Sequence, residues 1–201
     1  MAYKPRDAKP YLLHESDIAL FIDCAKCFFQ LHREDLPRPV PQGAEVQSPP
    51  AEALRLLFER CAAEAKARPS DYCEIRFRDP WTNLDISAPV GAVWVNAQNE
   101  LVLVGYRPQR PESAADGGLP LQLRREIDIS LWVLRQQEIK VSSQAYWIFG
   151  EVLAPYKAKD GWVRAMLTSV KDCLEADRKP QPSAHCEFCH SSSSLAKAES
   201  V

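Results

Sequence analysis

The chain has 201 residues and a net charge of −2, and 46% of its residues are hydrophobic. This length and apolar content suit one folded domain with its own core, and they exclude a disordered chain. The small negative charge excludes a protein coated all over in nucleic-acid-binding charge, although a local basic cluster can still bind phosphate.

The ends of the chain and its hydropathy predict where it resides. No apolar run approaches the ~20 residues that a membrane-spanning helix needs. The N-terminal segment MAYKPRDAKP is polar and has no apolar signal region. We therefore expect a soluble, cytoplasmic protein. Its predicted parts are a flexible arm at 1–15, a single domain at 16–190 and a disordered tail at 191–201.

The first predicted elements are helical. A helix is expected over 16–34, because apolar residues recur there with a helical period and Ser16 is suited to cap its start. Residues 36–50 are rich in proline and form an extended connector. The following segment, AEALRLLFERCAAEAKA at 51–67, predicts a strong amphipathic helix.

The remaining elements alternate between strands and helices. Three strands come first, the last two as a hairpin, and then a helix, a strand and a last helix; the ranges are 72–78, 92–96, 101–106, 121–137, 140–152 and 161–176. This order predicts an α/β or α+β fold with a mixed central sheet flanked by helices.

Four of the seven cysteines form two Cys-x-x-Cys pairs, Cys24 with Cys27 and Cys186 with Cys189. In a reducing compartment such pairs indicate metal binding rather than disulfides. Four thiolates close a tetrahedral zinc site, and the same ligands hold an iron–sulfur cluster of the 4Fe–4S type. The two-plus-two layout favours zinc. The alternatives are two unrelated pairs or a redox dithiol. A shared site would join the N-terminal helix to the C-terminal segment.

Four segments follow one another along most of the chain: DCAKCFFQLHR at 23–33, VGAVWVNAQNELVLVGYRPQ at 90–109, REIDISLWVLRQQEIKVSSQAYWIFGE at 125–151 and DGWVRAMLTSVKDCLEADRKPQPSAHCEFC at 160–189. In order and spacing they resemble PD-(D/E)XK nucleases of the RecB-like branch, which includes CRISPR-adaptation exonucleases. The resemblance implies a restriction-endonuclease-like fold, with cysteines at both ends around an iron–sulfur cluster.

The catalytic positions depart from the family pattern. Its strand-initial Asp corresponds to Gly91, its second acid to Gly105 and its Lys to Arg107, while the Gln and Tyr of the following helix correspond to Glu126 and Ser130. Nuclease chemistry in this family needs carboxylates that hold Mg²⁺. Glycine offers no ligand, and arginine stays protonated. The resemblance therefore implies a nuclease fold without nuclease activity.

Three functions follow from this comparison. The chain is expected to be a nucleic-acid-binding module or a structural subunit of a DNA- or RNA-processing assembly. The near-zero net charge and the absence of a long basic run favour the structural subunit, whereas the arginines near the hairpin favour the binding module. The enzyme alternative is an active metal-dependent nuclease whose ligands have moved to Glu126 and Asp128.

Two further groups of residues concern nucleic-acid binding. Arginines near the hairpin and the next helix can contact phosphate without a metal, or they can form a solvated rim. They are Arg107, Arg110, Arg124 and Arg125. Four of the five tryptophans, Trp81, Trp94, Trp132 and Trp147, are expected in the core, with base stacking as the alternative for one of them.

Overall fold

The computed structural model describes residues 10–34, 73–90, 92–109, 118–150, 152–186 and 188–189. The predicted connector at 36–50, the helix at 51–67, the tail at 191–201, and the residues Gly91 and Arg110 lie outside these ranges. The chain forms two compact units. The sheet unit comprises residues 1–15 and 45–163, and the cysteine unit comprises residues 16–44 and 164–201. The single domain over 16–190 stays a prediction.

The first sheet of the sheet unit has three strands in the order β1-β3-β2. Strand β1 (Leu12–His14) runs parallel to β3 (Asp85–Val90), and β2 (Cys73–Arg78) runs antiparallel to β3. The predicted strand at 72–78 is therefore confirmed as β2. Strand β3 was not predicted, and the flexible arm predicted over 1–15 does not extend through β1.

The second sheet has four strands in the order β4-β5-β6-β7. They are β4 (Ala92–Val95), β5 (Leu101–Arg107), β6 (Gln144–Phe149) and β7 (Val152–Lys157). The predicted hairpin is confirmed by the antiparallel register of β4 and β5. Strand β6 runs parallel to β5, and β7 returns antiparallel to β6. The single strand predicted at 140–152 is thus corrected to two strands, which meet at the turn residue Gly150 with φ 55°.

The predicted mixed α/β class is confirmed, but the single central sheet is corrected to two mixed sheets. One residue separates the end of β3 from the start of β4. Strand β3 pairs with β1 and β2, whereas β4 pairs with β5. The chain therefore passes from one sheet to the other at this point. A restriction-endonuclease-like arrangement stays a prediction.

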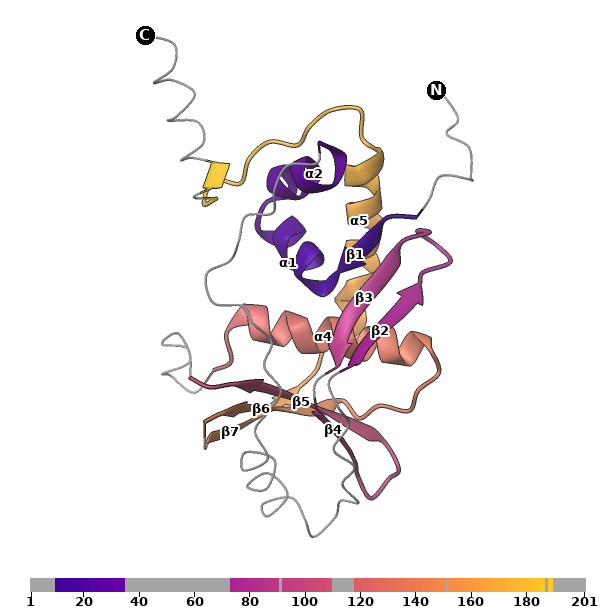
Figure 1. Ribbon diagram of the computed structural model, residues 1–201, viewed down its shortest axis with the longest axis vertical. Helices are drawn as coiled ribbons and strands as arrows, with labels where there is room; N and C mark the ends of the chain where they lie inside the picture. Colours follow the sequence, from indigo (N-terminus) through magenta and orange to yellow (C-terminus); the bar gives the residue numbers. More distant parts are fainter. Residues whose placement is uncertain are drawn as a thin grey trace. The chain divides into compact units, whose positions relative to one another are not determined.

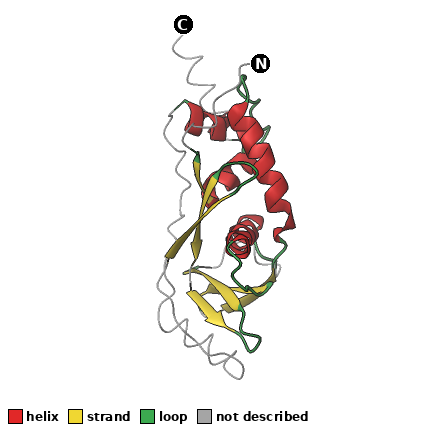
Figure 2. Ribbon diagram, turned by 90° about the vertical axis from the view of Figure 1, so that its right-hand side faces the viewer, coloured by secondary structure: helices red, strands yellow, loops and turns green. Residues whose placement is uncertain are grey.

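Helix α4 (Leu121–Gln136) lies between the two sheets of the sheet unit (Figures 1 and 2). One of its faces packs on the second sheet through a set of buried apolar residues: Leu123, Ile127, Leu131 and Leu134 from α4, with Leu103, Trp147 and Phe149 from the strands. Its other side meets the first sheet, where the rings of Trp132 and Phe77 pack edge to face 5.7 Å apart. A helix in this position must therefore be apolar on both sides.

The cysteine unit contains most of α1 (Glu15–Asp23), all of α2 (Ala25–Arg33) and most of α5 (Val163–Glu175), which follows the 3-10 turn η2 (Asp160–Trp162). The single helix predicted over 16–34 is corrected to two helices. The break falls at Cys24, whose φ of −157° and ψ of 101° are those of extended backbone. None of the described helices is both long and apolar enough to cross a membrane.

Candidate functional site

The four predicted cysteines lie together in the cysteine unit. Their sulfur atoms all lie within 4.8 Å of one another. The Sγ of Cys27 is 3.3 Å from that of Cys189 and 3.5 Å from that of Cys186, and the Sγ of Cys24 is 3.7 Å from that of Cys189. Cys186 is half-buried, and the other three cysteines are buried. Among the described residues this is the one group of His, Cys, Asp and Glu side chains with metal-ligand geometry.

The break between α1 and α2 positions the first pair. Cys24 is the N-cap of α2, and Cys27 lies in the first turn of that helix. Helix-type hydrogen bonds continue on both sides of the break: the Cys24 N–H donates to the Leu20 carbonyl, and the Phe28 N–H donates to the Cys24 carbonyl. Both thiols therefore sit at the positive end of α2, where thiolates are stabilised.

Two contacts connect the end of α2 to the C-terminal half of the cysteine unit. The Arg33 guanidinium donates to the carbonyl of Leu174 in α5, and it lies over the Phe29 ring at 5.5 Å. Past the end of α5, the Lys179 ammonium lies 2.8 Å from a Glu34 carboxylate oxygen. These contacts connect the C-terminal end of α2 to α5 and to the segment that leads to Cys186 and Cys189.

The thiols of the cluster differ in acidity. Burial raises the pKa of Cys24, but hydrogen bonds with the backbone of Ser183 and Cys27, and with neighbouring thiols, outweigh burial and lower it to about 7. Burial also raises the pKa of Cys27, and the adjacent thiols raise it further. The pKa of Cys189 is raised as well, again mainly by burial. Four thiolates crowded this closely therefore need a cation to offset their mutual repulsion.

This arrangement can hold a metal ion such as zinc. Four sulfurs about 2.3 Å from a zinc ion lie about 3.8 Å apart at the corners of a tetrahedron. Three of the sulfur–sulfur separations are 3.3–3.7 Å and all of them lie within 4.8 Å, so the four sulfurs can surround one such ion. Because the second pair comes about 160 residues after the first, a bound ion connects distant parts of the sequence.

Two of the nuclease-like positions, Gly105 and Arg107, lie on strand β5 of the sheet unit. Gly105 pairs with Trp147 across the two strands. A Cβ atom at Gly105 would lie 2.5 Å from Cε3 of Trp147, which is far inside van der Waals contact. The indole therefore fills the space that any side chain at position 105 would occupy. An acidic residue there would require the buried Trp147 ring to move.

Arg107 and Glu126 occupy the neighbouring nuclease-like positions and bind each other. Nη2 of Arg107 lies 3.0 Å from Oε2 of Glu126, and each side chain is 14% exposed. The guanidinium also lies 5.2 Å from the centre of the Trp147 ring. Burial raises the pKa of Glu126, and the positive charge of Arg107 opposes that rise. The Glu126 carboxylate therefore already has a cation as its partner.

Substitution of Gly105 tests this packing. Gly105→Ala is expected to lower the free energy of unfolding by about 2 kcal/mol, because the added methyl overpacks against Trp147. Gly161→Ala is the matched control, since a Cβ there meets nothing within 4 Å. Urea unfolding of both variants gives the comparison. Equal stability of the two variants would show that the Trp147 ring moves aside without a loss of stability.

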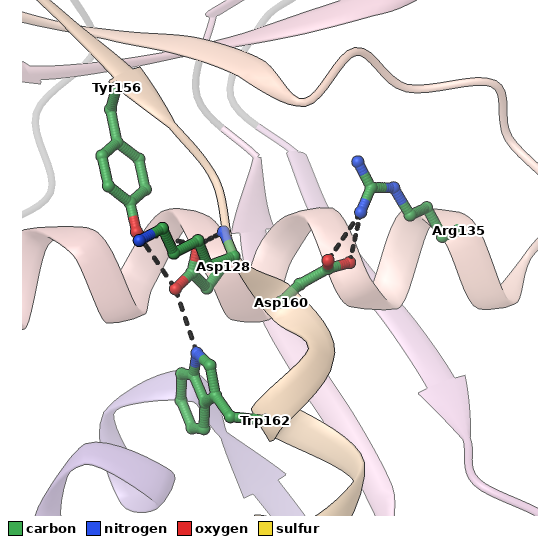
Figure 3. A network of polar contacts seen from close by, with 6 residues as sticks. Asp128, Arg135, Tyr156, Asp160 and Trp162 are labelled. Atoms are coloured by element: carbon green, nitrogen blue, oxygen red, sulfur yellow. Dashed lines mark hydrogen bonds and ion pairs between the residues drawn. The ribbon is translucent and has the colours of Figure 1, made fainter.

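Asp128, the second candidate for a relocated ligand, is the centre of a different network (Figure 3). Its buried carboxylate accepts hydrogen bonds from the Tyr156 hydroxyl at 3.1 Å, the Lys159 backbone N–H at 2.8 Å and the Trp162 indole N–H at 3.0 Å. Asp128 thus fastens α4 to β7 and η2. Glu126 and Asp128 stand two residues apart on α4, a spacing at which helical side chains do not face each other.

The pH dependence of stability should report the Tyr156 contact with Asp128. Burial, followed by the Asp128 charge, raises the pKa of Tyr156 to about 12. Because the folded protein holds this proton more tightly than the unfolded chain, the resulting stability is full below about pH 10 and is lost as pH rises toward 12. The difference in unfolding free energy between the wild type and Tyr156→Phe should shrink over that range. A difference that stays constant through it would contradict the assignment.

Three of the four predicted arginines lie in the part of the chain that the structure describes, and their contacts differ. Arg107 is paired with Glu126, and the exposed Arg124 donates from Nε to the Leu119 carbonyl at 2.6 Å. Arg125 is half-buried on α4. Phosphate binding by these arginines stays a prediction, although the charge of Arg107 is already balanced.

The tryptophans divide into two groups. Trp94, Trp132 and Trp147 are buried, with 3–5% of their surface exposed, and this confirms their placement in the core. Trp81 was expected in the core as well, but 74% of its surface is exposed. The flanking sequence Asp-Pro-Trp-Thr-Asn, rich in turn-forming residues, is the signal that would have placed it on a loop.

Comparison with known proteins gives little further information. No model of a protein family matches the chain, and no curated protein matches it. Among solved structures, a chain described as "Crystal structure of SSO0001" aligns over 96% of this chain and 87% of its own length. The TM-score is 0.49 and the sequence identity is 12%. These values assign the chain to no family.

Proposed function

We propose that this chain is a catalytically inactive PD-(D/E)XK-like protein that binds nucleic acid within a DNA- or RNA-processing assembly. The proposal begins from the resemblance of the hairpin and α4 to the nuclease motif. The absence of catalysis is supported by the Arg107–Glu126 ion pair beside Trp147, because the Glu126 carboxylate is already bound to a cation. Mg²⁺ would have to displace a guanidinium that is already bound to the carboxylate.

The relocated-ligand alternative has less support. A divalent cation in a nuclease needs several oxygen ligands around it. Glu126 is held by Arg107, while Asp128 accepts hydrogen bonds from Tyr156 and Trp162. Both networks would have to open for the two carboxylates to share one ion, and the unpaired Arg107 charge would then remain largely buried.

For the cysteine unit we propose a structural zinc ion. The sulfur separations suit one ion, because four cysteines around a single zinc lie at the corners of a small tetrahedron. In a four-iron cluster each cysteine binds a different iron atom, which holds the sulfurs farther apart. A closed four-thiolate site leaves no open position for substrate, so the role of the ion is to hold the fold together.

The deciding experiment joins metal analysis with cleavage and binding assays. The chain is purified without oxygen, and its zinc, iron and visible absorption are measured. It is then incubated with labelled single-stranded and duplex DNA and RNA in the presence of Mn²⁺. One zinc per chain, salt-dependent binding of at least one strand and no cleavage are the expected results.

Each part of the proposal can fail separately. A brown protein that contains several iron atoms would show that the cysteines hold an iron–sulfur cluster instead of zinc. Cleavage that is lost in Glu126→Ala would establish the relocated-ligand nuclease instead. If none of these nucleic acids binds at low salt, the remaining hypothesis is the structural subunit, in which the fold serves protein contacts alone.

A further inference from the structure

The exposure of Trp81 sets it apart from the rest of the sheet unit. Trp81 lies in the turn between β2 and β3, and 74% of its surface is exposed. It is the most exposed large apolar side chain among the described residues. A tryptophan carries the largest apolar surface of any side chain, so leaving it in water forgoes the stabilisation that burial provides.

The turn that carries Trp81 is fixed by its own hydrogen bonds. Oδ2 of the buried Asp79 accepts from the Thr82 N–H at 2.9 Å and from the Thr82 hydroxyl at 2.5 Å. The Asp79 N–H donates to the Leu84 carbonyl, and the Asn83 N–H donates to the Asp79 carbonyl. Asn83 takes the left-handed conformation, with φ 58°. Because the turn is already ordered, ligand binding at Trp81 costs little conformational entropy of the loop.

A cation is fixed beside the same turn. The Arg78 guanidinium donates from Nε and Nη2 to Oδ1 of Asn83, at 3.0 and 2.7 Å. Asn83 carries no charge, and the described residues include no carboxylate within ion-pair distance of Arg78. The described part of the chain thus orients an exposed guanidinium that forms no ion pair with a described carboxylate. This differs from Arg76, which pairs with Glu74 on the same strand.

We propose that this turn, Arg78 to Asn83, binds single-stranded nucleic acid, with a base stacked on Trp81 and a phosphate at Arg78. An exposed aromatic face accepts any base, and a planar guanidinium offers paired donors to phosphate oxygens. Duplex DNA hides its base faces in the stack, so the single strand is the matching form. The inference rests on the proposed nucleic-acid function and adds the place and the form of the ligand.

The carboxylates near the turn limit the length of the strand that can bind there. Asp85 stands opposite Arg78 across the β2–β3 pair, and Glu74 lies farther along β2. These carboxylates would repel a long phosphate backbone that ran along the sheet. The turn therefore takes a short stretch of a few nucleotides. A protein with an apolar pocket beside a carboxylate is the competing occupant, and the experiment below separates the two.

The test measures binding of the metal-loaded full chain to a short fluorescein-labelled oligo(dT), its RNA counterpart and a duplex, by fluorescence anisotropy. Trp81→Ala should weaken single-strand binding about 10-fold or more, and Trp81→Phe should retain most of the affinity. Arg78→Ala should weaken binding and reduce the salt slope by about 1. Leu121→Ala, which removes another exposed apolar side chain of the sheet unit, is the control and should bind like the wild type.

The intrinsic fluorescence gives a second readout. Trp81 should supply most of the emission that iodide quenches, and the oligonucleotide should protect it. If the wild type binds but Trp81→Ala binds equally well, the turn is not the site, while the proposed function stands. If the wild type binds no strand at low salt, both proposals fail. Loss of assembly with a protein, with strand binding unchanged in Trp81→Ala, would assign the turn to protein docking and overturn the inference.

Discussion

Cys27→Ser is expected to release the metal ion and to unfold the cysteine unit. Cys27 has the closest sulfur neighbours of the cluster, in Cys186 and Cys189, so its loss opens the tetrahedron at its most crowded corner. Closing a loop of this length contributes about 5 kcal/mol by analogy with a disulfide, and that contribution should disappear with the ion. Metal analysis and urea unfolding of the purified variant measure the two effects.

Cys173→Ser provides the control for this experiment. Cys173 belongs to the same unit and is half-buried in α5, but its thiol contacts the Ala25 carbonyl at 3.9 Å and stands outside the cluster. Its replacement should keep one metal per chain and change stability by about 1 kcal/mol or less. A chelator added to the wild type should reproduce the effect of Cys27→Ser. Retention of the metal and of wild-type stability in Cys27→Ser would refute the shared site.

Asp128→Ala should cause the second large loss, about 3–5 kcal/mol in the free energy of unfolding. The carboxylate accepts from Tyr156, from the Lys159 backbone and from Trp162, and all three donors would lose their partner in a largely buried place. The variant keeps the metal, because Asp128 belongs to the sheet unit. Urea unfolding of the metal-loaded chain measures the loss.

Two variants on the same helix show whether the network is the cause. Asp128→Asn retains the shape and one acceptor oxygen, so it should lose about 1–2 kcal/mol. Gln122→Ala changes an exposed position of α4 and should stay within about 0.5 kcal/mol of the wild type. An Asp128→Ala protein as stable as Gln122→Ala would mean that water replaces the lost acceptor.

The hairpin and α4 could be predicted because their patterns are local. The runs at 92–96 and 101–106 are rich in β-branched and aromatic residues around a short polar linker, and the helix carries apolar residues at helical spacing. The cysteine cluster was equally accessible, since paired Cys-x-x-Cys spacing depends on chemistry rather than on the surrounding fold.

The missed elements owe their structure to distant partners. Strand β3 has the sequence DISAPV, whose polar residues and proline hide a strand that is buried between β1 and β2. Strand β1 is three residues long and exists only as a neighbour of β3. The break at Cys24 was missed because the helical period of apolar residues continues across it. None of these features has a local sequence signal strong enough to predict it.

The surroundings of Gly105 and Arg107 could be predicted only in part. The sequence shows that these positions hold no carboxylate, but it does not show which groups fill the space around them. Trp147 lies 42 positions beyond Gly105, and Glu126 meets Arg107 only when α4 packs on β5. The sequence therefore shows which residues stand at these positions, and the packing of β5, β6 and α4 shows which groups surround them.

The proline in β7 bears on how this protein behaves at high concentration. Strand β7 forms one outer edge of the four-stranded sheet, and Pro155 lies within it. An exposed edge offers unpaired backbone groups to the strands of other molecules, which is a common route to aggregation. Proline has no N–H to donate, and the exposed Lys157 adds a charge that resists burial. Pro155 and Lys157 therefore oppose the pairing of this edge with strands of other molecules, and so they oppose fibril growth.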